Sequence, residues 1–349
     1  MRAAVFSGPN TMPVKEIPIS NCRGKEALLK VKACAVCGYD ARVFRSGHHK
    51  VRPPVILGHE ICAETLETLS TTSGTVIKSR SRVAVIPTVP CLNCHYCHNG
   101  HYNICTNLRE LGSTLDGGFA EYVKIPEQIL KIDGLVPVPD NLSDEEAALL
   151  EPLACCLNGF LHTGSITNKS DIAIIGDGPI GLLHLQLSKL YGGKTIVIGK
   201  VPSRLDIAKS LGADETITVS DSNIETINAV LRSTKGIGAT AVIIATSNST
   251  AFDVALGIAS KNSTINVFAG LPNGRSSMLV DANWLHYNQV SITGSFSSTP
   301  SILQKAAELV STRKINLSKI ISHRYPLEYV EEAIGVTENY HGLRAVITS

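Results

Sequence analysis

The sequence predicts an α/β protein in which a β-rich N-terminal region precedes a doubly wound parallel sheet. A glycine-rich turn, Gly176-Asp-Gly178-Pro-Ile-Gly181, stands between an apolar run and a stretch of helical periodicity. β-branched runs and helical stretches then alternate, as they do in parallel sheets. The first 150 or so residues have a different character, with short strands, prolines and nearly all of the cysteines.

Length and charge narrow the class of protein. A chain of 349 residues is long enough for two domains, each with its own core. A formal net charge of +2 gives no electrostatic reason to expect a nucleic acid or a membrane surface as partner. The first residues lack the apolar segment of a signal peptide, and no apolar run is long enough to cross a bilayer. We therefore expect a soluble, cytoplasmic protein.

Six short apolar or β-branched runs follow one another in the middle of the chain, and helical stretches separate the earlier ones. Six strands that alternate with helices form a doubly wound sheet. The strands are expected at residues 172–175, 195–198, 215–219, 241–245, 264–268 and 290–293.

The glycine-rich turn has the pattern that binds a dinucleotide pyrophosphate. Gly176 allows the tight turn, Gly178 lets backbone amides approach the phosphates, and Gly181 lets the helix pack against the strand. The helix that begins around Pro179 and Ile180 would add its N-terminal amides and their partial positive charge. The order strand, turn, helix, strand favours a nucleotide site over an ordinary glycine turn.

The end of the second strand indicates which nucleotide is bound. NAD-binding proteins usually carry an acidic residue there, about 20 positions past the first glycine, and Gly199 stands in its place. Its absence leaves room for a 2′-phosphate, which Lys200, Ser203 and Arg204 could neutralise and hydrogen-bond. We predict that NADP is preferred over NAD; the alternative is a solvated turn with ordinary surface cations.

Four of the ten cysteines lie close together, with the spacing C-x2-C-x2-C-x7-C at Cys91, Cys94, Cys97 and Cys105. This spacing lets four thiolates surround one tetrahedral zinc ion and leaves no open position. Disulfides are disfavoured in the cytosol, and nothing around the cysteines favours an iron–sulfur centre. We predict a structural zinc lobe at about residues 88–108.

Two further segments carry side chains of the kinds that bind zinc. Cys37 is followed by Asp40, and His59 and Glu60 follow a proline-led strand. Thiolate, imidazole and carboxylate are zinc ligands. A single cysteine or histidine is more often structural. The two segments therefore indicate a zinc site only in combination with a nucleotide-binding fold on the same chain.

With these motifs in this order, the chain resembles the zinc-dependent medium-chain alcohol and polyol dehydrogenases over essentially its whole length. The resemblance rests on residues 37–40, 58–60, 91–105, 151–153 and 176–181. It implies a GroES-like β-barrel catalytic domain, a Rossmann nucleotide-binding domain and a C-terminal segment that returns to the first domain. The corresponding boundaries are 1–153, 154–295 and 296–349.

The resemblance also implies two zinc ions per chain, one structural and one catalytic. Cys37 and His59 match catalytic-zinc ligands, and Glu151, in the sequence Glu-Pro-Leu, matches the third ligand position of polyol and sugar dehydrogenases. Glu60 is a further candidate ligand, and Asp40 matches the carboxylate that orients the zinc-binding histidine. Cys155 and Cys156 compete with Glu151 in sequence position, and we expect them to pack in a helix instead.

Other positions match residues that contact the coenzyme. Arg344 matches a basic residue that reaches the pyrophosphate, and Asn158 matches a position near the nicotinamide. A surface arginine and an ordinary helix asparagine are the alternatives.

The chain departs from the family at the start of the proton relay, where Tyr39 replaces the usual serine or threonine and Arg42 the common histidine. Our hypothesis is that the Tyr39 phenol, or a water held by Glu151, passes the proton and that His48 or His49 carries it onward. The alternative is that Tyr39 only shapes the pocket wall.

The resemblance implies an NAD(P)-dependent oxidoreductase that acts on a small alcohol, with a polyol or sugar favoured by Glu151. A simple alcohol dehydrogenase or an L-threonine dehydrogenase is the nearest alternative, followed by a non-catalytic redox sensor and a zinc-free quinone reductase. The family forms homodimers and homotetramers.

Overall fold

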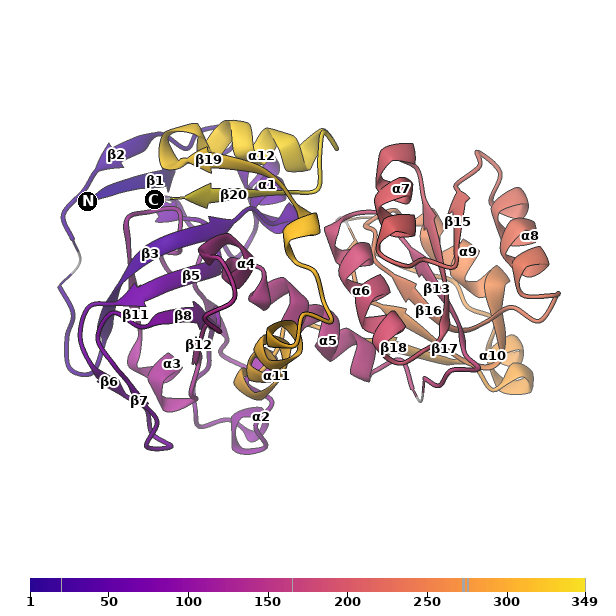
Figure 1. Ribbon diagram of the computed structural model, residues 1–349, viewed down its shortest axis with the longest axis horizontal. Helices are drawn as coiled ribbons and strands as arrows, with labels where there is room; N and C mark the ends of the chain where they lie inside the picture. Colours follow the sequence, from indigo (N-terminus) through magenta and orange to yellow (C-terminus); the bar gives the residue numbers. More distant parts are fainter. Residues whose placement is uncertain (20, 165, 272–273, 275, 349) are drawn as a thin grey trace. The chain divides into compact units, whose positions relative to one another are not determined.

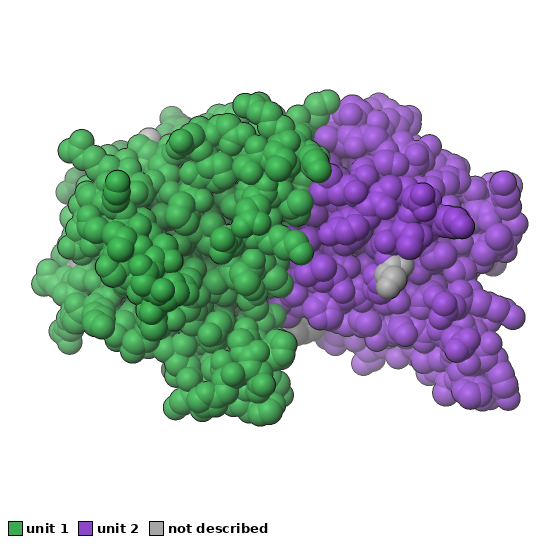
Figure 2. All heavy atoms as spheres, turned by 60° about the horizontal axis from the view of Figure 1, so that its bottom comes forward, with its two compact units in different colours: residues 1–154, 297–349 green, residues 155–296 purple. Residues whose placement is uncertain are grey.

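Residues 1–19, 21–164, 166–271, 274 and 276–348 are described by the computed structural model of the chain. They fall into two units, which Figure 2 colours separately. Unit 1 comprises residues 1–154 and 297–349, and unit 2 comprises residues 155–296. Within the described ranges, no helix has both the length and the apolar character that a membrane-spanning helix needs.

Unit 2 is built on a sheet in which every pairing is parallel, in the order β15-β14-β13-β16-β17-β18 (Figure 1). This is the doubly wound order in which the chain starts at the centre and works outward to each edge. The predicted fold class is confirmed, and each predicted strand is present. The strands are β13 (Asp171–Ile175), β14 (Lys194–Gly199), β15 (Glu215–Thr218), β16 (Ala239–Ile244), β17 (Ala259–Val267) and β18 (Ser291–Gly294).

Continuous apolar runs form the central strands because both faces of this sheet are buried. Ile174, Val197 and Ile243 are fully buried in three adjacent strands. A strand with one solvated face would alternate apolar and polar residues instead. The helices of this unit are α6 (Pro179–Leu190), α7 (Pro202–Ser210), α8 (Asn223–Ser233), α9 (Thr250–Ile258) and α10 (Ala282–Asn288).

Strand β17 begins five residues earlier than predicted. Ala239 pairs with Ala259 and Ala241 with Thr264, so several residues of β17 lie opposite a single step of β16. Asn262 has a positive φ of 58° within this bulge. A bulge interrupts the two-residue alternation, so the polar segment 260–263 carried no strand pattern.

Unit 1 contains a sheet in the order β12-β8-β5-β3-β20-β19, with β11 also paired to β3. The final strand pairs antiparallel with β3, so the C-terminal segment is part of the same sheet as the N-terminal region. The strands are β3 (Ala27–Ala35), β5 (Glu60–Thr65), β8 (Arg82–Val85), β11 (Tyr122–Ile125), β12 (Leu135–Pro137), β19 (Ile321–Pro326) and β20 (Arg344–Thr348).

Smaller sheets and short helices complete unit 1. Strand pairs β1–β2, β1–β4, β6–β7 and β9–β10 are all antiparallel. Their strands are β1 (Arg2–Phe6), β2 (Val14–Glu16), β4 (Val55–Ile56), β6 (Leu69–Ser70), β7 (Val76–Ile77), β9 (Thr88–Val89) and β10 (Arg109–Glu110). The helices are α1 (Gly38–Ser46), α2 (His95–His98), α3 (Glu127–Lys131), α4 (Asp144–Ala148), α11 (Pro300–Ser311) and α12 (Val330–Glu338), with 3-10 turns at Tyr102–Ile104, Ser318–Ile320 and Leu327–Tyr329. Helix α5 (Leu150–Leu161) begins in unit 1 and ends in unit 2.

Candidate active site and metal sites

Antiparallel pairing of β3 and β5 brings two predicted zinc-binding segments together. Cys37 caps the N-terminus of α1, two residues after the end of β3, and Glu60 begins β5, where it pairs with Ala35. One ligand atom from each of Cys37, His59 and Glu60 lies within 4.8 Å of the other two. Sulfur, nitrogen and oxygen donors at such distances fit a zinc ion.

The Asp40 carboxylate contacts both zinc-binding segments, the one at Cys37 and the one at His59. It is fully buried, and its carboxylate accepts hydrogen bonds from the backbone amides of Cys37 (2.9 Å) and Gly58 (3.3 Å). Its Oδ1 lies 3.5 Å from His59 Nδ1. Burial alone would lower the pKa of His59, but the charge of Asp40 and hydrogen bonds with Asp40 and Cys37 raise it well above its ordinary value. The same negative charge would favour a metal cation on the imidazole in place of the proton.

Glu60 and Arg344 form an ion pair inside unit 1. Arg344 Nη2 lies 2.9 Å from Glu60 Oε1, and Nη1 donates to the Val36 carbonyl at 3.0 Å. Burial raises the pKa of Glu60, and the charge of Arg344 offsets part of that rise. Among the described residues, neither Glu60 oxygen has a hydrogen-bond partner of good geometry. A buried carboxylate whose oxygens lack such partners fits a metal cation as its partner.

Glu151 is buried in the first turn of α5 but lies outside the group of three ligands. Burial alone would lower the pKa of Arg344, but the charges of Glu60, Cys37, Glu151 and Asp40 raise it. Several acidic groups therefore act on one guanidinium, and the excess negative charge suits a divalent cation. Direct binding of zinc by Glu151 stays a prediction, as does contact of Arg344 with a pyrophosphate.

In the metal-free protein, Arg344→Met should lower the free energy of unfolding by about 3–5 kcal/mol, because it leaves the Glu60 carboxylate buried without its counter-charge. Urea unfolding measures the change. Arg324→Met is the matched control, since Arg324 forms a 3.1 Å ion pair with Glu145 but its side chain is 53% exposed. An exposed pair contributes at most about 1 kcal/mol. Equal losses in the two variants would contradict the role assigned to Arg344.

The Tyr39 phenol lies beside the three-ligand group. Its ring is 5.9 Å from the His59 ring, centroid to centroid, and its hydroxyl is 2.9 Å from Ser113 Oγ and 3.4 Å from His48 Nδ1. The rings of His48 and His49 lie 4.3 Å apart. Burial raises the pKa of Tyr39 and lowers that of His48. The predicted path from Tyr39 to His48 is thus within hydrogen-bond reach, and Ser113 joins it.

Ser113 was missed in the sequence because it is 74 residues from Tyr39 and belongs to no ligand motif. Glycines allow the backbone near Ser113 to pack closely against the segment at Gly58. A Cβ on Gly112 or Gly117 would lie 2.5 Å or 2.1 Å from the Gly58 carbonyl oxygen, so only glycine lets the two backbones approach. The glycine-rich stretch 112–118 was the available signal.

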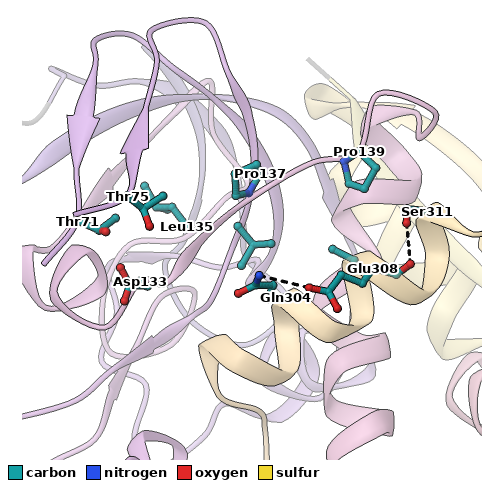
Figure 3. A pocket seen from close by; sticks show the side chains of 11 residues that line it. Thr71, Thr75, Asp133, Leu135, Pro137, Pro139, Gln304, Glu308 and Ser311 are labelled. Atoms are coloured by element: carbon teal, nitrogen blue, oxygen red, sulfur yellow. Dashed lines mark hydrogen bonds between the residues drawn. The ribbon is translucent and has the colours of Figure 1, made fainter. Parts of the chain in front are cut away.

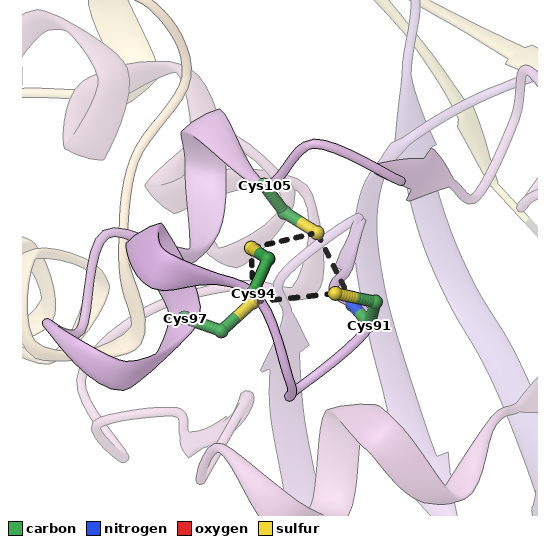
Figure 4. A group of neighbouring side chains, drawn as sticks. All are labelled: Cys91, Cys94, Cys97 and Cys105. Carbon is green, nitrogen blue, oxygen red and sulfur yellow. Dashed lines mark hydrogen bonds between the residues drawn. The ribbon is translucent and has the colours of Figure 1, made fainter.

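The four predicted lobe cysteines converge around one point (Figure 4). Cys94 caps α2, Cys97 lies within it, and Cys105 follows the 3-10 turn. The Cys94 sulfur is 3.5 Å from the Cys97 sulfur and 3.9 Å from the Cys105 sulfur. The Cys91 and Cys97 sulfurs are 3.9 Å apart. Four sulfurs about 2.3 Å from a tetrahedral zinc would be about 3.8 Å apart. The spacing fits one zinc ion and is too long for disulfides.

The thiols of this lobe differ in acidity. Hydrogen bonds with Thr106 and Cys97, the one from the Thr106 backbone foremost, lower the pKa of Cys94 to about 5, and burial raises that of Cys97 to about 12. Four thiolates at these distances repel one another unless a cation lies between them. His95, His98 and His101 are outside the group, which agrees with a site made of cysteines alone.

The glycine-rich turn has the geometry that its sequence predicts. Gly176 has a φ of +130°, and a Cβ on Gly181 would lie 1.9 Å from the Gly176 carbonyl oxygen. Gly178 caps α6, Pro179 occupies the first turn, and nothing lies within 4 Å of a Cβ built on Gly178. The start of α6 is therefore open for a phosphate.

Residues predicted for the adenosine end of the coenzyme lie at the end of β14 and in α7. Gly199 is buried, Lys200 and Ser203 are exposed, and Arg204 is buried in α7. Asn158 is buried in α5, and its Nδ2 is 3.4 Å from the Phe296 carbonyl oxygen. Their contacts with a coenzyme stay predictions.

Cys155 and Cys156 lie in α5, as expected, and outside both ligand groups.

A hollow of about 360 Å³ lies elsewhere in unit 1, between β12, the β6–β7 hairpin and α11 (Figure 3). Asp133, Gln304 and Glu308 line it, and Gln304 donates a 3.3 Å hydrogen bond to Glu308. It contains none of the predicted site residues, so we assign it no part in the chemistry.

Comparison with known proteins gives consistent matches along the chain. The alcohol dehydrogenase GroES-like domain matches residues 23–140, and the zinc-binding dehydrogenase domain matches residues 179–312. L-galactonate-5-dehydrogenase from Escherichia coli (strain K12) is 31% identical over 339 residues, which cover 96% of this chain and 94% of that protein. Sorbitol dehydrogenase from Bacillus subtilis (strain 168) is 29% identical over 340 residues, or 96% and 92% of the two chains.

A solved structure shows the same likeness in three dimensions. It is described as a zinc-binding dehydrogenase from Sinorhizobium meliloti 1021 bound to NADP, and it matches with a TM-score of 0.90 at 28% identity. The match covers 100% of this chain and 99% of that one. Fold and family matches together define a zinc-binding oxidoreductase with a GroES-like domain. The chain belongs to the zinc-dependent alcohol dehydrogenase family.

Proposed function

We propose that the chain catalyses hydride transfer between a secondary alcohol, a polyol or sugar, and NAD(P). The observation that carries this is the Cys37–His59–Glu60 group on a chain that also has the open glycine-rich turn of a nucleotide-binding sheet. The names of the sorbitol and L-galactonate relatives support polyols and sugars as substrates. The position of Glu151 supports the same substrate class over simple alcohols.

A zinc ion at Cys37, His59 and Glu60 would polarise the substrate oxygen as a Lewis acid and so ease loss of the hydroxyl proton. Asp40 holds the His59 ring in place, and the Glu60–Arg344 pair keeps a carboxylate at the site. The Tyr39 hydroxyl, within reach of Ser113 and His48, takes the proton toward solvent. The amides at the start of α6 hold the coenzyme pyrophosphate.

The coenzyme is NADP in preference to NAD, because Gly199 replaces the usual acid and Lys200 stands beside it. The NADP in the Sinorhizobium meliloti structure supports use of this coenzyme in the family.

Each chain binds two zinc ions, one at the three-ligand group and one at the four-cysteine lobe. The protein is cytoplasmic and a homodimer or homotetramer.

Tyr39→Phe should lower kcat by about 100-fold and leave the KM for coenzyme unchanged, because it removes the hydroxyl but keeps the ring. A positioned proton-transfer group typically contributes 10²–10⁴-fold. Steady-state kinetics across pH measure the effect. Ser113→Ala keeps the phenol but removes its 2.9 Å partner, so a smaller loss is expected. Full turnover by Tyr39→Phe would show that the phenol only shapes the pocket.

The proposed function is tested by following nicotinamide absorbance with purified protein. NAD⁺ and NADP⁺ are each offered with polyols, aldoses, simple alcohols and L-threonine. Fastest oxidation of a polyol or sugar supports the proposal. Faster oxidation of L-threonine or a simple alcohol would contradict the proposed substrate class but not the proposed hydride transfer. Coenzyme binding without oxidation of any compound would favour a redox sensor.

A further inference from the structure

Asp177, between the first two glycines of the turn, reaches the end of the neighbouring strand. It lies two residues after the end of β13, and its side chain is buried. Its Oδ2 accepts hydrogen bonds from the backbone amides of Lys200 (2.8 Å) and Val201 (2.7 Å). The carboxylate therefore sits at the carboxyl end of β14, just before α7 begins at Pro202.

Asp177 also accounts for the glycine at position 199. A Cβ on Gly199 would lie 2.4 Å from Asp177 Cβ and 2.5 Å from its Oδ2. Asp177 Cβ is attached to the backbone of a tight turn and cannot move aside as the end of a long side chain could. Any side chain at 199 would collide with it. The two positions are thus coupled, and only one of them can carry the acid.

A carboxylate from the glycine-rich turn therefore lies at the end of the second strand, where the strand itself has no acid. In nucleotide-binding sheets, a carboxylate at the end of the second strand accepts a hydrogen bond from the adenosine ribose. Asp177 Oδ2 accepts hydrogen bonds from the amides of Lys200 and Val201. Asp177 Oδ1 makes no hydrogen bond or ion pair with the described residues. Those amides are not available to a 2′-phosphate.

We propose that Asp177 is the specificity-determining residue at the adenosine ribose. Its carboxylate accepts a ribose hydroxyl of NAD and repels the 2′-phosphate of NADP, against the attraction of Lys200. This inference rests on the proposed use of NAD(P). It implies that the preference for NADP is smaller than Gly199 and Lys200 alone would give.

The test is a titration of NAD⁺ and NADP⁺ against the wild type and Asp177→Asn, without substrate. Asparagine can still accept from both amides but carries no charge. The repulsion between the Asp177 carboxylate and a 2′-phosphate is reduced by solvent at this partly exposed end of the strand, so a moderate fold-change is expected. The ratio of Kd for NAD⁺ to Kd for NADP⁺ should rise about tenfold, mainly through tighter binding of NADP⁺.

Asp171→Asn is the matched control, because Asp171 lies at the opposite end of the same strand, β13, and its loss should leave the ratio unchanged. A double variant, Asp177→Gly with Gly199→Asp, moves the carboxylate to its usual place and should favour NAD⁺. Both coenzymes are titrated against the same sample, so partial unfolding of a variant cancels from the ratio.

An unchanged ratio in Asp177→Asn would overturn the inference while leaving the proposed function intact. Failure of the wild type to bind either coenzyme would overturn both.

Discussion

His59→Ala should lower kcat/KM by at least about 10³-fold and remove about one zinc ion per chain. The imidazole lies in the three-ligand group with Cys37 and Glu60, and Asp40 holds it from behind. Loss of a Lewis acid worth several kcal/mol corresponds to this factor, since each 1.36 kcal/mol is tenfold in rate. Rates and zinc content are measured on the same preparations.

His98→Ala is the control for this variant. His98 is exposed in the cysteine lobe and outside both ligand groups, so its replacement should leave the rate and the zinc content unchanged. Normal turnover by His59→Ala would show that the three-ligand group is not the catalytic centre.

Cys97→Ser should lower the melting temperature by about 10 °C and remove the other zinc ion. Removing one partner of a buried charged cluster costs about 3–5 kcal/mol, and each kcal/mol shifts Tm by about 2–4 °C in a chain of this size. Activity per folded molecule should change little, because a site closed by four cysteines has no position for substrate. Calorimetry and metal analysis give the two readings.

Cys22→Ser removes a thiol that is exposed and outside both groups, so its Tm should match that of the wild type. If Cys97→Ser keeps both its zinc and its Tm, the lobe is not a metal site.

Local patterns made the nucleotide-binding unit predictable from sequence. Its strands are continuous apolar runs because both sheet faces are buried, and Gly181 has to be glycine because a Cβ would meet the Gly176 carbonyl at 1.9 Å. The cysteine lobe was predictable for a similar reason, since all four sulfurs come from one short segment. The early start of β17 was not, because a bulge breaks the periodicity.

The three-ligand group could be assembled only through the family resemblance, because β3 and β5 meet by tertiary pairing. Ser113 reaches Tyr39 by close backbone contacts at Gly58, and Asp177, after β13, reaches Lys200, after the neighbouring strand β14. No spacing rule encodes such approaches. Gly199 is the instructive case: its sequence position indicated a missing acid, whereas in the fold an acid from the turn lies against it.

The most direct test of the central claim is to measure zinc content and alcohol oxidation together while a chelator removes the metal stepwise. We predict two zinc ions per chain. Coenzyme reduction should be lost in proportion to removal of the more exchangeable ion, which we assign to Cys37, His59 and Glu60. It should recover when zinc is restored. A rate that stays constant while that ion is removed would contradict a zinc-dependent mechanism at Cys37, His59 and Glu60.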